Sequence, residues 1–251
     1  MRRILNMALA SVLLSGLSGL TLADEVDPKA VLDKGIKALG GEEKLSKAAS
    51  YTVKAKGTLT FNGNDNEFKT QGTVQGLDHY RSEFEGVFNG DAIKGVTVVN
   101  GDKGWRKFGD NMMELEGDGI ANEKRTIYLA VLPTTLVPLK GKDFKLEAAG
   151  EEKVDDKSAV AIKVTGPDGK DFKLFFDKES GLPVKLVARV IGFGGDEFTQ
   201  ETTYTNYKEF DGAKKATKLS SKRDGEKFIE QEVTDFKVID KVPADTFSEP
   251  K

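Results

Sequence analysis

The stretch YTVKAKGTLTF at residues 51–61 decides the fold class of this chain. Its side chains alternate: the odd positions from Tyr51 to Phe61 are mostly apolar, and the even positions carry Thr or Lys. Successive side chains of a β-strand point to opposite faces of the sheet. The alternation therefore predicts a long strand with one face buried and the other in water.

Turn-forming pairs recur at short intervals along the rest of the chain, with Asn62-Gly63 and Asn100-Gly101 as two examples. Such pairs favour tight β-hairpins. A parallel sheet would need a helix between its strands, and the chain has too few helical segments for that. We expect a mainly β chain with a few helices, built on one large curved antiparallel sheet of about ten to thirteen strands. Clear strand-forming runs lie at residues 94–99, 172–177, 184–190, 198–204 and 228–238.

Three segments have helical spacing of their apolar residues. The first begins at Asp27-Pro28, which is typical of a helix start, and ends before Gly40-Gly41. A second short helix is expected over residues 42–49 and a third over residues 120–132. Two prolines bracket the stretch after the third helix, residues 134–139.

Composition excludes several classes of function. The chain has 251 residues, with 38 Lys+Arg against 41 Asp+Glu and a formal net charge of -3. This balance lacks the basic excess of a protein that binds phosphate backbones, so we expect no nucleic-acid partner. The absence of cysteine removes disulfides, thiolate metal sites and cysteine nucleophiles.

The N-terminus has the pattern of a secretory signal peptide. Arg2-Arg3 precede an apolar stretch that runs to Leu20, and the small residues Thr21 and Ala23 suit a cleavage site. We expect residues 1–23 to be removed and residues 24–251 to form one domain outside the cytoplasm. The alternative is that the segment is retained as a membrane anchor, because its apolar stretch approaches the length needed to span a bilayer.

No motif supports catalysis. Residues 194–198 read GGDEF, the signature of diguanylate cyclases, but they stand between two strand-forming runs and are better interpreted as a hairpin tip. His79 is the only histidine, and no GxSxG sequence is present. We therefore expect a protein that is not an enzyme and has no catalytic residues, no cofactor and no metal site. A carboxylate-based hydrolase is the less favoured alternative.

Several segments together resemble the LolA/LolB-like superfamily of bacterial outer-membrane lipoprotein-sorting proteins. They include the GGEEKL start at residues 40–45, the strand at 51–61, the hairpin at 99–105 and the FDKESGLPV sequence at 176–184. The resemblance implies a half-open antiparallel barrel around helices, with an apolar cavity for acyl chains, in the periplasm. It also implies a carrier that touches membrane surfaces transiently and works as a monomer. The stretch VQGLD at 74–78 lacks the arginine that latches the lid of the family's carriers.

The resemblance also indicates which residues line the cavity, with residues 120–132 and 134–139 as a lid. The ligand is expected to be the acyl chains of a lipid or lipoprotein. An envelope sensor or protein-interaction module on the same fold, which binds a protein partner, is the main alternative. The expected cavity residues are Tyr51, Val53, Leu59, Phe61, Phe68, Val74, Tyr80, Phe84, Trp105, Met112 and Leu115, with Leu129, Leu132 and Leu136 from the lid side.

Overall fold

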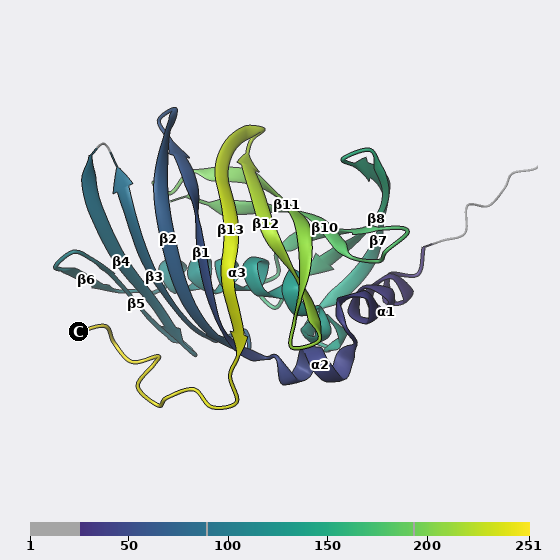
Figure 1. Ribbon diagram of the computed structural model, residues 1–251, viewed down its shortest axis with the longest axis horizontal. Coiled ribbons are helices and arrows are strands. Elements are labelled where there is room, and N and C mark those ends of the chain that lie inside the picture. Colours follow the sequence, from purple (N-terminus) through teal and green to yellow (C-terminus); the bar gives the residue numbers. More distant parts are fainter. Residues whose placement is uncertain (1–25, 89, 193) are drawn as a thin grey trace, which may run out of the picture.

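A computed structural model of the protein describes residues 26–88, 90–192 and 194–251, so the expected signal segment lies outside the described residues. Thirteen strands form one antiparallel sheet in the order β6-β5-β4-β3-β2-β1-β13-β12-β11-β10-β9-β8-β7 (Figure 1). The strands are β1 Ser50–Phe61, β2 Asn64–Gln75, β3 His79–Phe88, β4 Asp91–Asn100, β5 Lys103–Phe108, β6 Asn111–Glu114, β7 Lys145–Val154, β8 Lys157–Thr165, β9 Asp171–Asp177, β10 Pro183–Ile191, β11 Glu197–Phe210, β12 Ala213–Arg223 and β13 Glu226–Val238. The helices are α1 Pro28–Leu39, α2 Glu42–Lys47, α3 Asp118–Thr135 and the 3-10 helix η1 Val137–Lys140.

The sheet consists of two meanders that meet in its middle. Strands β1 to β6 follow one another outward to one edge, and β7 to β13 return from the other edge until β13 pairs with β1. Helix α3 connects β6 to β7 and so links the two edges, lying behind the sheet in Figure 1. The prediction of one large curved antiparallel sheet with a few helices is confirmed.

Strand β1 shows the alternation expected from its sequence. Tyr51 and Ala55 are buried, whereas Lys54 and Lys56 are exposed. Tyr51 pairs directly with Val74 of β2, and directly paired residues of antiparallel strands share a face of the sheet. We call the face of Tyr51 the helix side, because α3 packs on it, and the opposite face the outer face.

Local sequence determines the boundaries of the first two helices. The Asp27 carboxylate accepts a hydrogen bond of 2.9 Å from the backbone N–H of Lys29, and Gly40, with a φ of 127°, ends α1. Helix α2 ends at Lys47, earlier than the expected residue 49, because Ser50 already begins β1.

Helix α3 is longer than the expected 120–132, because it begins at Asp118 and continues through Pro133 to Thr135. A proline this close to the C-terminus removes only one hydrogen bond of the last turns. Leu136 then adopts a left-handed φ of 62° and ends the helix. Leu136 and Leu139 are 0% and 1% exposed, so the stretch after α3 is part of the core.

Two apolar clusters lie on the helix side. In the larger one, α1, α2, the end of α3 and η1 pack against β8 to β12, with Leu39, Leu132 and Leu174 fully buried. In the smaller one, Ile127 and Val131 of α3 pack against β1, β2, β4 and β13. Burial of each large aliphatic side chain contributes about 1.5–3 kcal/mol, so these contacts dominate the stability of the fold.

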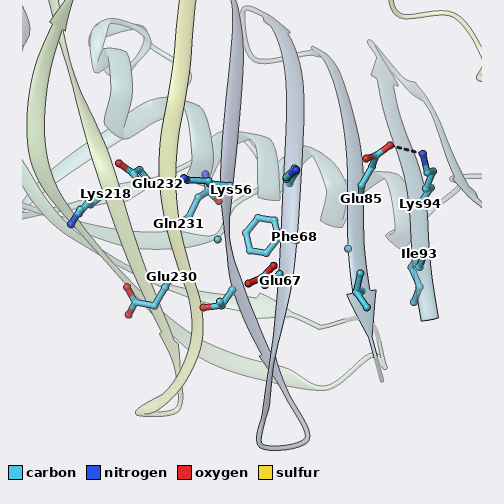
Figure 2. Close-up of a pocket in the computed structure, with 16 residues that line it drawn as sticks. Lys56, Glu67, Phe68, Glu85, Ile93, Lys94, Lys218, Glu230, Gln231 and Glu232 are labelled. Carbon is cyan, nitrogen blue, oxygen red and sulfur yellow. Dashed lines mark hydrogen bonds and ion pairs between the residues drawn. The ribbon is translucent and has the colours of Figure 1, made fainter. Parts of the chain in front are cut away.

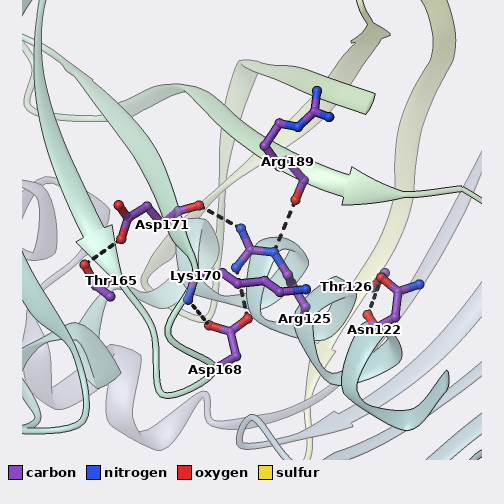
Figure 3. Close-up of polar contacts among 8 residues, drawn as sticks. All are labelled: Asn122, Arg125, Thr126, Thr165, Asp168, Lys170, Asp171 and Arg189. Carbon is purple, nitrogen blue, oxygen red and sulfur yellow. Dashed lines mark hydrogen bonds and ion pairs between the residues drawn. The ribbon is translucent and has the colours of Figure 1, made fainter. Parts of the chain in front are cut away.

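Three consecutive charged residues of α3 tie the helix to both halves of the sheet. Glu123 forms an ion pair with Arg106 of β5, and the Lys124 ammonium lies 2.6 Å from Asp102 in the turn before β5. Figure 3 shows the other side, where the buried Arg125 is held by the hairpin of β8 and β9 and by β10. Its guanidinium donates to Asp168 Oδ2 at 3.0 Å, to the Asp171 carbonyl at 2.7 Å and to the Arg189 carbonyl at 3.2 Å.

The C-terminal tail lies against the outer face. Phe247 is 6% exposed, and its ring centroid is 5.4 Å from that of His79. The Lys107 ammonium donates a hydrogen bond of 2.6 Å to the carbonyl oxygen of Lys251. No helix within the described ranges combines the length and apolar character needed to cross a membrane.

Candidate functional site

The helix side of β1 to β6 carries large apolar side chains from the level of α3 to the hairpin ends of the strands. Direct strand pairing places the side chains near these hairpin ends on the same face of the sheet as Tyr51. Phe61 and Met113 are 56% and 54% exposed, and Ile93 and Phe108 are each 37% exposed. We call this surface the open strip; its residues are Leu59, Phe61, Phe68, Phe84, Phe88, Ile93, Phe108 and Met113.

Glycines shape the floor of the open strip. A Cβ atom at Gly86 would lie 2.8 Å from Phe88 Cε2, and one at Gly95 would lie 2.5 Å from Phe108 Cε1. The phenyl rings therefore lie across the glycine backbone instead of standing away from the sheet. Ring centroids of Phe84 and Phe88 are 6.0 Å apart, so neighbouring rings form a continuous apolar surface.

The structure divides the expected cavity residues into four places. Leu59, Phe61, Phe68 and Phe84 lie in the open strip. Beneath α3 lie Tyr51, Val53, Val74 and Tyr80, with Leu115 against Gly104 near the start of that helix. Leu129, Leu132 and Leu136 belong to the larger core cluster. Trp105 and Met112 lie on the outer face, because they pair with Val98 and Lys107.

Four residues of the open strip were not predicted from the sequence. Phe88, Ile93, Phe108 and Met113 are strand residues whose face depends on the hairpin register. The Asn-Gly turn at residues 89–90 carried the necessary signal. A two-residue turn predicted from that sequence would pair Phe88 with Asp91 and Gly86 with Ile93, and the structure has both pairs.

The open strip is built from apolar side chains. Within the described ranges, no three His, Cys, Asp or Glu side chains are grouped so that they could hold a metal ion. Burial raises the pKa of both Tyr51 and Tyr80, so their phenols are protonated at neutral pH. An apolar ligand could gain free energy on the open strip simply by leaving water.

A groove of about 800 Å³ lies along the same strands, and its charged lining residues belong to the outer face (Figure 2). One row of directly paired side chains crosses this groove from β12 to β4. Lys94 and Glu85 of this row form an ion pair of 2.7 Å. The groove therefore carries a charged row on the outer face, although Phe68 and Ile93 of the open strip and Val87 of the outer face also line it. The row is Lys218, Glu232, Lys56, Lys69, Glu85 and Lys94.

The overall fold matches solved structures, although no protein-family model and no curated protein matches the chain. A LolA superfamily protein from Nitrosomonas europaea aligns with a TM-score of 0.58 and 14% identity, over 89% of this chain and 98% of that one. A protein domain from Vibrio parahaemolyticus named for outer membrane lipoprotein sorting gives 0.52 and 11%, over 86% and 97%. A DUF1329 family protein from Desulfovibrio piger gives 0.53 and 14%, over 89% and 98%. At these identities the likeness concerns the fold, and the fold of this chain is LolA-like, as the sequence resemblance implied.

Proposed function

We propose that this protein is an exported, non-enzymatic carrier that binds the acyl chains of lipids or lipoproteins on the open strip. The observation that carries the proposal is the exposure of Phe61, Ile93, Phe108 and Met113 on the side of the sheet that bends round α3. Large contiguous apolar surfaces on soluble proteins usually mark a ligand or a partner. The lipoprotein-sorting name of the Vibrio parahaemolyticus domain supports the same class of ligand.

The expected affinity follows from burial alone. Each methylene group removed from water contributes about 0.8 kcal/mol, so roughly ten methylenes supply about 8 kcal/mol before any opposing contribution. The loss of translational and rotational freedom on binding opposes this gain. We expect dissociation constants in the micromolar range or weaker, which suits a carrier that must also release its cargo.

The cellular setting of the proposal comes from the N-terminal segment. Cleavage after Ala23 would release residues 24–251 as one domain into the periplasm. There the protein would work as a monomer and touch membrane surfaces only while loading or unloading cargo. The proposed carrier uses no cofactor and binds no nucleic acid.

Two exposed aliphatic residues on opposite faces give a matched pair for the test. Ile93 lies in the open strip and is 37% exposed, whereas Val87 lies on the outer face and is 50% exposed. Binding of the neutral probe N-phenyl-1-naphthylamine would be followed by fluorescence. We expect Ile93→Asp to weaken binding by at least about tenfold, because a carboxylate would have to be desolvated beneath the probe. Val87→Asp should leave binding unchanged.

Native mass spectrometry of the mature protein from its own envelope, followed by lipid extraction, would identify the cargo class. A stoichiometric lipid or acylated peptide is the expected result. A ligand-free mass, together with no uptake of the neutral probe, would refute the carrier.

A protein-interaction module is the second candidate, and the edge strand β6 favours it. Strand β6 is paired on one side only, by β5, and Met112 and Met113 are 37% and 54% exposed. An extended peptide could pair with such an edge. A defined complex with an envelope protein that Met113→Lys abolishes, formed by protein free of lipid, would favour the module over the carrier.

A further inference from the structure

Arg223 lies on the helix side at the end of β12, next to the open strip. Its β12 neighbour on the same face, Ser221, pairs with Ile229 of β13, and Ile229 pairs with Leu59 of β1. The ends of β12 and β1 lie at the same end of the sheet, at the top of Figure 1. From β12 to Leu59 of the open strip on β1 the sheet crosses two strand spacings, a lateral distance on the order of 10 Å.

Aromatic rings hold the Arg223 guanidinium in place. Its Cζ atom is 3.6 Å from the ring centroid of Phe228 and 5.2 Å from that of Phe198. Its Nε donates a hydrogen bond of 3.0 Å to Gln200 Oε1. These contacts hold the Arg223 side chain, which is half-buried. The two Nη groups lie at its end.

Arg223 differs from the other arginines in its electrostatic partners. The structure describes five arginines, and four of them form ion pairs with a carboxylate: Arg81, Arg106, Arg125 and Arg189. Among the described residues, no carboxylate forms such a pair with Arg223. Glu226 stands directly opposite Arg223 in the register without an ion pair between them. The neighbouring Asp224 accepts a hydrogen bond of 2.8 Å from the Thr199 backbone N–H.

We infer that Arg223 binds the anionic head group of an amphiphile whose acyl chain lies along the open strip. The inference rests on the proposed function and adds the chemical class of the ligand's polar end, a carboxylate or a phosphate. A guanidinium offers paired N–H donors that match both groups in a bidentate arrangement. Partial burial strengthens the attraction, because less water screens the charges. The stacked rings already hold the side chain, so little rotamer freedom is lost on binding.

The test compares a charged and a neutral form of one probe. The probe is 11-(dansylamino)undecanoic acid, and its methyl ester has the same chain without the negative charge. We expect the wild-type protein to bind the acid at least about tenfold more tightly than the ester. In Arg223→Gln the affinity for the acid should fall to that for the ester, and the affinity for the ester should not change. Arg223→Lys should recover part of the difference, and the exposed Arg189→Gln should behave as wild type.

Displacement of the bound acid then separates the two kinds of head group. Dodecanoate and dodecyl phosphate should both displace the probe from the wild-type protein, and the stronger competitor identifies the preferred head group. Displacement by inorganic phosphate alone, as effective as by dodecyl phosphate, would overturn the inference. Equal affinities for acid and ester in the wild-type protein would also overturn it and would leave the carrier intact. If neither form binds, the proposed function itself fails.

Discussion

The ammonium of Lys215 on β12 donates a hydrogen bond of 2.7 Å to the carbonyl oxygen of Thr134 at the end of α3. The same nitrogen lies 5.1 Å from the ring centroid of Phe236. Lys215 is 4% exposed, and a lysine is rarely buried so deeply unless it is paired. A positive charge at a helix C-terminus is favourable, because the last carbonyls carry partial negative charge. Lys215 therefore joins the end of α3 to the middle of the sheet.

Burial lowers the pKa of the Lys215 ammonium from its usual 10.5 to about 8. Between these two values the unfolded chain holds a proton on Lys215 that the folded chain has released. Unfolding then takes up a proton, so the free energy of unfolding should rise with pH over this window, by about 3 kcal/mol in all. Urea denaturation at several pH values between 7 and 9.5 would measure the first part of this rise.

Lys215→Met is the control for this pH dependence. The variant has no ammonium to titrate, so its free energy of unfolding should lack the extra rise between pH 8 and pH 9.5. Burial raises the pKa of Tyr204 and Tyr207, which reduces stability only once unfolded tyrosines ionise near pH 10. Parallel pH profiles for the wild-type protein and Lys215→Met would contradict the prediction.

Replacement of Arg125 by Leu should destabilise the protein by about 3–5 kcal/mol, because the substitution removes one partner of a buried ion pair. Three acceptors on β9, β10 and the turn between β8 and β9 would lose their donor. Arg189 forms an ion pair of 2.9 Å with Glu197 and is exposed, so Arg189→Leu should change stability by about 1 kcal/mol or less. Equal losses from the two substitutions in chemical denaturation would show that Arg125 is not an anchor of α3.

The sequence was sufficient to predict the sheet because that information is local. The alternation in β1 and the Asn62-Gly63 turn act over a few residues, and both are present in the structure. The pairing of Tyr51 with Val238 is different, because it joins residues far apart in the chain and closes the two meanders. No local pattern encodes which strand completes such a sheet, so the strand order could not be predicted from the sequence.

The faces of the strands explain why the candidate site was predicted only in part. Leu59 and Phe84 were selected from strands whose alternation could be read directly. Trp105 was selected for its residue type, although the tight turn at Asn100-Gly101 already pairs Gly104 with Val99 and turns Trp105 to the other face. The contact of Arg223 with rings from β11 and β13 could not be predicted, because it depends on the register of three neighbouring strands.

Gly95→Ala should disturb the open strip. A methyl group there would lie 2.5 Å from Phe108 Cε1, so the ring must move away from the sheet. We expect a loss of stability of about 1–3 kcal/mol and weaker binding of N-phenyl-1-naphthylamine. Gly119→Ala is the control, since its methyl group would meet only Leu115 Cδ2 at 3.9 Å in the first turn of α3. That substitution should leave binding unchanged and stabilise the helix by up to about 1 kcal/mol. Unchanged stability and binding in Gly95→Ala would mean that the ring positions do not determine the floor of the strip.

The position of Trp105 makes tryptophan fluorescence a test of which face binds ligand. Its indole belongs to the outer face, so acyl ligands on the open strip should leave the emission of the wild-type protein almost unchanged. A tryptophan moved to the strip, in the double variant Trp105→Phe and Phe84→Trp, should shift its emission to shorter wavelength when dodecanoate binds. Phe84 suits this purpose because its ring lies 5.7 Å from that of Phe68, between centroids, within the strip. A ligand-induced shift from Trp105 but not from the tryptophan at position 84 would place the ligand on the outer face, in or beside the charged groove.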